Sequence, residues 1–102
     1  MRAPAQTIAC EPERVILVGT EQPKMLLPIG ESLAELERLA QTAGLVIVGR
    51  AVQALRRPHP ATLIGQGKVA EIKAQVEAQC ADVVVFDDSL SPAQQRNLET
   101  AF

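Results

Sequence analysis

Aromatic side chains are nearly absent from this sequence, which has no Trp, no Tyr and only two Phe among 102 residues. Domains that bind single-stranded nucleic acid by base stacking present several exposed aromatic rings. The sequence therefore excludes a nucleic-acid reader of the stacking type.

Metal-binding and redox residues are also scarce. The only cysteines are Cys10 and Cys80, which have no C-x-x-C spacing, and the only histidine is His59. These counts exclude a cysteine zinc site and a multi-histidine metal centre, and they fit a reducing compartment. We therefore expect no metal site in this chain. Cys80 falls on an apolar helical stripe, so we expect a buried thiol without special reactivity.

Long hydrophobic runs are missing too. The longest aliphatic runs cover residues 15–18 and 45–48, far fewer than the ~20 residues of a membrane-spanning helix. Residues 1–13 contain no apolar stretch of signal-peptide length, so we expect a cytoplasmic protein. With 47% hydrophobic and 22% charged residues, the chain has the composition of a globular protein. We expect a flexible arm over residues 1–13 and a single domain over residues 14–102.

The hydrophobic pattern alternates between strands and helices. Four strands are expected, over residues 14–20, 45–55, 62–65 and 82–86. Three helices are expected to begin at Ser32, at Gly67 or Lys68, and at Ser91, and Gly44 ends the first of them. The fold class is therefore α/β, with a four-stranded, mostly parallel or mixed sheet flanked by three helices.

The pattern also makes specific statements about the sheet and the core. The connection over residues 56–61 is shorter than the dozen residues of a usual parallel crossover, so the second and third strands should run antiparallel if they are neighbours. Val84 should lie in a central buried strand. Leu39 should belong to the apolar stripe of the first helix.

Acidic residues are absent from one segment of the chain. Residues 1–37 hold six acids and three bases, and residues 71–102 hold six acids and two bases. Residues 38–70 hold five bases and no acid, although the whole chain has a net charge of −2. This segment is either a solvated face with a chance charge cluster or a docking surface for phosphate or RNA.

A glycine-rich turn, Gly65-Gln66-Gly67-Lys68, precedes the second predicted helix. With Asp87 beyond the next strand it matches the G-x-G-x-x-A dinucleotide pattern, although the pattern is permissive and the preceding strand is very short. The turn has three possible roles: a purely structural turn, a contact for an anion or RNA phosphate at a helix N-terminus, or a dinucleotide site.

Neither a nucleotide-hydrolysing site nor a catalytic residue is evident. A phosphate-binding P-loop would need Gly in place of Thr62 and Ser or Thr in place of Val69. His59 stands between two prolines and is interpreted as an exposed loop residue, without the orienting acid that nucleophilic catalysis requires.

Four segments in order resemble the N-terminal domain of the HflX family of ribosome-associated GTPases. They are residues 31–44, a helix ending in a Thr-Ala-Gly triplet; residues 58–69, similar to the family's P-x-P-x-x-x-(I/V)-G-x-G-K segment; residues 85–88; and residues 90–99, close to L-S-P-x-Q-x-R-N-L-E. The family prefers an aromatic residue at the position of Leu63, and residues 1–13 resemble nothing in it.

The resemblance implies a cytosolic GTP-binding protein that docks on the large (50S) ribosomal subunit and helps split stalled or idle ribosomes. It also implies that this chain is a fragment, a monomer without GTPase activity of its own, whose parent is a GTP hydrolase that binds GTP and Mg²⁺. The expected partners are ribosomal RNA and proteins and the parent's own GTPase domain, and the alternative function is a small nucleotide-binding α/β domain that uses the glycine-rich turn. The candidate contacts for RNA or phosphate are Arg50, Arg56, Arg57, His59, Gly65, Gln66, Gly67 and Lys68.

Overall fold

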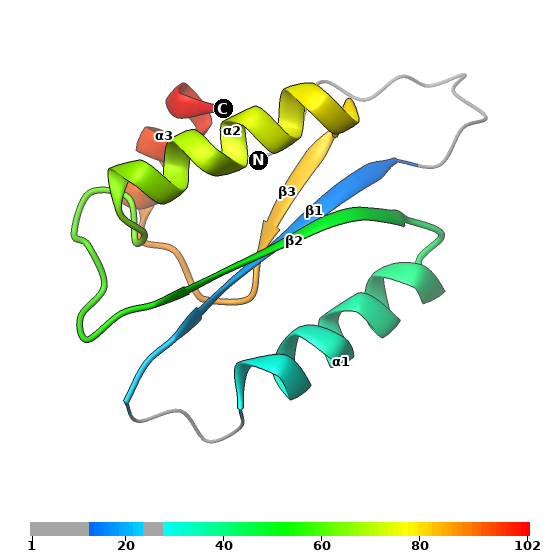
Figure 1. The fold of residues 1–102 in the computed structure, drawn as a ribbon, viewed down its shortest axis with the longest axis horizontal. Coiled ribbons are helices and arrows are strands. Elements are labelled where there is room, and N and C mark those ends of the chain that lie inside the picture. The colour runs from blue at the N-terminus through cyan, green and yellow to red at the C-terminus, as the bar shows by residue number, and fades with distance from the viewer. Residues whose placement is uncertain (1–12, 24–27) are drawn as a thin grey trace.

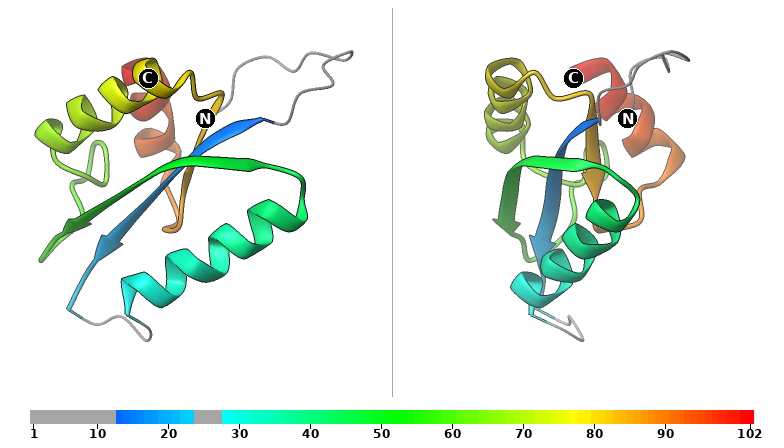
Figure 2. Two further views of the ribbon diagram at one scale, coloured as in Figure 1. Left: turned by 45° about the vertical axis from the view of Figure 1, so that its right-hand side comes forward. Right: turned by 90° about the vertical axis from the view of Figure 1, so that its right-hand side faces the viewer.

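The computed structural model describes residues 13–23 and 28–102, which form an α/β fold of three layers (Figure 1). The elements in order are β1 (Arg14–Glu21), α1 (Ile29–Thr42), β2 (Val46–Ala54), α2 (Gln66–Gln79), β3 (Val83–Phe86) and α3 (Pro92–Ala101). Helix α1 covers one face of the sheet, and α2 and α3 lie on the opposite face (Figure 2). The predicted flexible arm falls, apart from Glu13, outside the described residues.

The sheet has three strands in the order β2-β1-β3, and both pairs are parallel. The predicted fourth strand over residues 62–65 is wrong. This segment forms a tight turn closed by an isolated antiparallel bridge between His59 and Leu63. The Thr62 hydroxyl donates to the carbonyl oxygen of Ile64 at 2.7 Å. Polar groups of the turn are therefore hydrogen-bonded within the turn and not to a neighbouring strand. The expected antiparallel strand pairing is therefore absent from the described sheet.

Strand β1 lies at the centre of the sheet, and its continuous aliphatic run is buried on both sides. Residues 15–18 are all 0% exposed. Ile16 and Val18 belong to the cluster under α2 and α3, whereas Val15 and Leu17 belong to the cluster under α1. Because successive side chains of a strand point to opposite faces, a strand covered on both faces is apolar throughout.

The predicted start of α3 and end of α1 are confirmed, whereas α2 begins at Gln66, just before the predicted Gly67 or Lys68. Ser91 caps α3 through a capping box with Gln94, and Pro92 occupies the first helical turn, as predicted. Gly44 follows α1 with a φ of +85°, a backbone conformation that glycine adopts without steric cost. Ser32, however, is not the cap of α1, because the helix already begins at Ile29.

The structure also corrects two predictions about buried side chains. Cys80 is exposed and has a φ of 52°, because it occupies the left-handed position that ends α2 and so leaves the apolar stripe. Leu39 is 59% exposed and lies outside the buried face of α1, which is formed by Leu33 and Ala40. Among the described residues, no helix is long and apolar enough to cross a membrane.

Val84 provides a test of the core. It is 5% exposed, but β3 pairs only with β1 and is therefore an edge strand of the described sheet, not the predicted central one. We predict that Val84→Asp prevents folding, because burying an unpaired carboxylate costs several kcal/mol against a total stability of about 5–15 kcal/mol. Thermal unfolding followed by circular dichroism measures the effect.

The matched control is Val52→Asp, the same substitution at a residue of β2 that is 39% exposed. It should cost only about 1 kcal/mol, the range of strand propensities. Equal melting temperatures for the two variants would contradict the placement of Val84 in the core.

Candidate functional site

The carboxyl ends of the three parallel strands meet at one edge of the sheet, which is where open α/β sheets bind their ligands. At this edge β2 is followed by residues 56–65, which we call the basic loop and which leads into α2. Seven of the eight candidate contact residues lie in this loop or in the first turn of α2. They are Arg56, Arg57, His59, Gly65, Gln66, Gly67 and Lys68.

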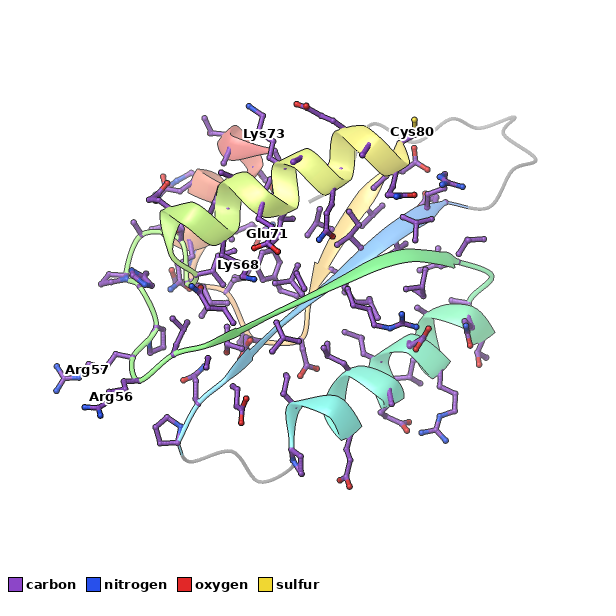
Figure 3. The ribbon with its side chains drawn as sticks, viewed as in Figure 1. Arg56, Arg57, Lys68, Glu71, Lys73 and Cys80 are labelled. Atoms are coloured by element: carbon purple, nitrogen blue, oxygen red, sulfur yellow. The ribbon has the colours of Figure 1, made fainter. Side chains whose placement is uncertain are left out.

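Arg56 and Arg57 project from the tip of the basic loop, away from the sheet and the helices (Figure 3). Both are exposed. Within residues 13–23 and 28–102, neither guanidinium group has an ion-pair partner. Two adjacent guanidinium groups without acids are suited to bidentate contacts with phosphate.

The other bases of the acid-free segment are neutralised by acids that lie just outside it. Three ion pairs do this: Arg38 with Glu35 at 2.6 Å, Arg50 with Glu37, and Lys68 with Glu71 at 2.9 Å. The net charge of +5 read from the sequence therefore leaves only Arg56 and Arg57 as uncompensated charges of that segment.

Lys68 lies apart from the two arginines. Its side chain is 18% exposed and turns beneath α2 toward Glu71, whereas Arg56 and Arg57 extend in another direction (Figure 3). Lys68 therefore does not join Arg56 and Arg57 in one exposed basic surface. The signal for the pairing was present in the sequence, because Lys68 and Glu71 are three residues apart on a helix.

Two apolar side chains of the basic loop anchor it in the core. Leu63 and Ile64 are 3% and 0% exposed and pack in the cluster under α2 and α3. The backbone amides of His59 and Leu63 donate to each other's carbonyl oxygens at 2.9 and 2.8 Å. The His59 side chain remains exposed beside the two arginines in sequence. The loop therefore presents polar side chains on a fixed backbone.

The glycine-rich turn does not have the geometry of a nucleotide site. The turn does not directly follow a strand, because residues 55–64 separate it from β2. The Gly65 amide donates to Oε1 of Gln53 at 2.9 Å instead of pointing to open space. Lys68 is engaged with Glu71. Together with Thr62 and Val69 in place of the P-loop residues, this arrangement does not fit GTP or its Mg²⁺ ion.

Asp87 and Asp88, which follow β3, connect the elements at this edge of the sheet. Asp88 Oδ2 accepts from the hydroxyl and the amide of Thr20 at 2.9 and 3.2 Å, and Asp87 Oδ2 accepts from the hydroxyl of Ser32 at 2.6 Å. These bonds give both carboxylates a structural role. The described residues contain no group of three or more His, Cys, Asp or Glu side chains that could hold a metal ion.

An open hollow of about 420 Å³ lies beside Arg56, between the ends of β1 and β2. It is lined by Glu21, Gln22, Pro23, Ala54, Leu55 and Arg56. Sequence reasoning missed Glu21 and Gln22, because their proximity to Arg56 depends on the pairing of β1 with β2. The same pairing brings the Leu55 amide to the carbonyl oxygen of Glu21 at 2.8 Å.

Comparison with known proteins decides the family. A family model described as "GTP-binding GTPase N-terminal" matches residues 30–102. The chain belongs to the HflX family of GTPases, as an N-terminal domain. A protein named GTPase HflX from Lacrimispora saccharolytica is 48% identical over 89 residues, which are 87% of this chain and 21% of that protein. The GTPase HflX of Escherichia coli is 45% identical over 69 residues, 68% of this chain and 16% of that protein.

The chain thus spans about a fifth of the length of the HflX proteins that it matches. The four segments that resembled the family come together in the fold. Ser32 of the first segment contacts Asp87 of the third, and the fourth segment contacts the basic loop through Gln94 and Asn97. Much of the HflX-type pattern is therefore accounted for by contacts between its segments.

Gly67 is not required by the packing of the described residues. A Cβ atom at Gly67 would meet nothing within 4 Å, and the residue lies in the first turn of α2. We predict that Gly67→Ala stabilises the fold by about 0.5–1 kcal/mol, because alanine loses less backbone freedom in a helix. Chemical denaturation measures the change.

Gly19→Ala is the contrasting variant, because its Cβ would lie 2.6 Å from Cδ1 of Ile29, 3.1 Å from Cδ2 of Leu33 and 3.3 Å from Cγ1 of Ile29, so a shift of one terminal methyl group does not relieve the crowding. It should destabilise the fold. A loss of stability in Gly67→Ala would contradict the absence of neighbouring atoms around the Gly67 Cβ position.

Proposed function

We propose that this chain is the ribosome-binding, regulatory domain of an HflX-family GTPase, which docks on the large ribosomal subunit through the basic loop and helps split stalled or idle ribosomes. Membership of the HflX family supports the general assignment. The observation that carries the docking surface is the pair of exposed arginines, Arg56 and Arg57, which have no acidic partner among the described residues.

The chemistry of the pair suits a ribosomal RNA backbone. Phosphate contacts by Arg release condensed counterions, so they contribute affinity without reading sequence. The near absence of aromatic residues agrees with backbone contacts and argues against base stacking. Leu63 and Ile64 anchor the backbone of the basic loop in the core, which lowers the conformational entropy that the loop loses on binding.

The remaining parts of the proposed activity belong to the longer HflX proteins. We assign GTP and Mg²⁺ binding, and hydrolysis, to a GTPase domain outside these 102 residues, because the described residues offer no P-loop that fits them. The second proposed partner is that GTPase domain itself. The proposed place of action is the cytoplasm.

The docking surface is tested by replacing both arginines. We predict that Arg56→Glu combined with Arg57→Glu weakens binding to large ribosomal subunits at least tenfold and reduces the slope of log affinity against log salt by about 1.5, the value for two lost phosphate contacts. Co-sedimentation with purified subunits at several salt concentrations measures both quantities.

The control is a second pair of charge reversals, Lys73→Glu with Arg96→Glu, at exposed residues of α2 and α3. It changes the net charge by the same amount, so it should affect binding much less if the basic loop is the contact. Normal binding by the folded Arg56 and Arg57 variant would reject the loop as the docking surface. A larger loss in the control pair would transfer the contact to α2 and α3.

A further inference from the structure

Three side-chain amides hold the backbone of the basic loop, which has no strand neighbour of its own. Gln53 of β2 accepts from the Gly65 amide at 2.9 Å. From α3, Nε2 of Gln94 donates to the carbonyl oxygen of His59 at 2.9 Å, and Nδ2 of Asn97 donates to that of Ala61 at 2.9 Å. The two residues of α3 are three positions apart and therefore lie on one face of the helix.

Gln94 has two separate functions in these contacts. Its Oε1 accepts from the Ser91 amide at 2.9 Å and so completes the capping box of α3. Its Nε2 is the group that reaches the loop. The residue is 8% exposed, so both halves of the amide are bonded in a largely buried setting, where a lost partner is costly.

The conformation of the loop makes such an external hold necessary. Leu63 has a φ of +66°, in the left-handed region that non-glycine residues rarely adopt. Its amide donates to His59, whose carbonyl oxygen accepts from both Leu63 and Gln94. The bond from α3 therefore acts directly on the strained turn that follows Arg56 and Arg57.

We propose that Gln94 and Asn97 are positioning residues, which fix the basic loop so that Arg56 and Arg57 project together for contact with RNA phosphate. The proposal rests on the docking function proposed above. It adds that α3 determines the geometry of the contact between the two arginines and RNA, although Gln94 and Asn97 do not themselves bind phosphate. A displacement of α3 would displace the loop with it, because Gln94 belongs to the cap of the helix and to the loop at once.

The decisive variant is Gln94→Glu. A glutamate still accepts from the Ser91 amide, as in the usual capping box, but its carboxylate cannot donate to the His59 carbonyl. Asn97→Ala removes the second bond without a change in charge. The matched control is Gln95→Glu, the same substitution at the next residue, whose exposed side chain donates to Glu99 at 3.3 Å and not to the basic loop.

Hydrogen exchange in this 102-residue chain measures the hold directly. We expect the amides of His59 and Leu63 to exchange about tenfold faster in Gln94→Glu, as for the loss of one largely buried hydrogen bond. The increase should be smaller in Asn97→Ala, because the bond from Asn97 to the Ala61 carbonyl is exposed. Both amides should keep their rates in Gln95→Glu. The amide of Ile16 in β1 should stay protected in all variants, which controls for folding.

Acid provides a rescue that a merely steric role would not show. Below about pH 4, where a carboxyl group becomes protonated, the side chain in Gln94→Glu can donate again. Protection of His59 and Leu63 should then return toward the value of the unsubstituted chain at the same pH. Unchanged exchange in Gln94→Glu and Asn97→Ala at neutral pH would overturn the proposal.

Subunit binding separates this proposal from the one on which it rests. Gln94→Glu should bind large subunits about fivefold more weakly than Gln95→Glu, which carries the same charge. The positioning role would be overturned if Gln94→Glu exchanged faster but bound subunits normally, while the Arg56 and Arg57 variant bound them poorly. Normal binding by the arginine variant would reject the docking function instead, while the exchange rates would still decide whether α3 holds the loop.

Discussion

The burial of β1 between two helical layers is the constraint on which the rest of the structure depends. Residues 15–18 supply side chains to both apolar clusters, and the strand pairs with β2 on one side and β3 on the other. The end of β1 also provides Thr20, which binds Asp88, and Glu21, which binds the backbone after β2. The position of the basic loop therefore depends on β1, because β1 pairs with β2 and the loop follows the carboxyl end of β2.

The sequence predicts those parts of the fold that depend on hydrophobic runs and on local capping chemistry. The strands β1, β2 and β3 and the cap of α3 follow from aliphatic runs and from Ser-Pro chemistry, which are local signals. The segment 62–65 was misassigned because its apolar residues also pack in the core, but from a turn. The positive φ of Leu63 belongs to a turn that is bonded to α3, a contact that no window of sequence contains. The exposure of Cys80 follows from the left-handed conformation that ends α2 one residue before the apolar stripe would continue.

The candidate site shows the same division between local and distant information. The sequence correctly singles out an acid-free segment, but folding pairs three of its five bases with acids on α1 and α2. The amides that hold the loop were not recognised, since their partners lie 12, 35 and 36 residues away. Neutral Gln and Asn residues carry no charge or periodicity signal, so only the structure connects them to the arginines.

The parallel strand order has a consequence for biosynthesis. Val15 pairs with Val83, so the central strand must wait for a partner that is translated 68 residues later. At about 5–20 residues per second, that delay lasts about 3–14 s. During this time the aliphatic run of β1 lacks its second strand neighbour. Such long-range pairing also raises the contact order, which slows folding relative to a helical protein of the same size.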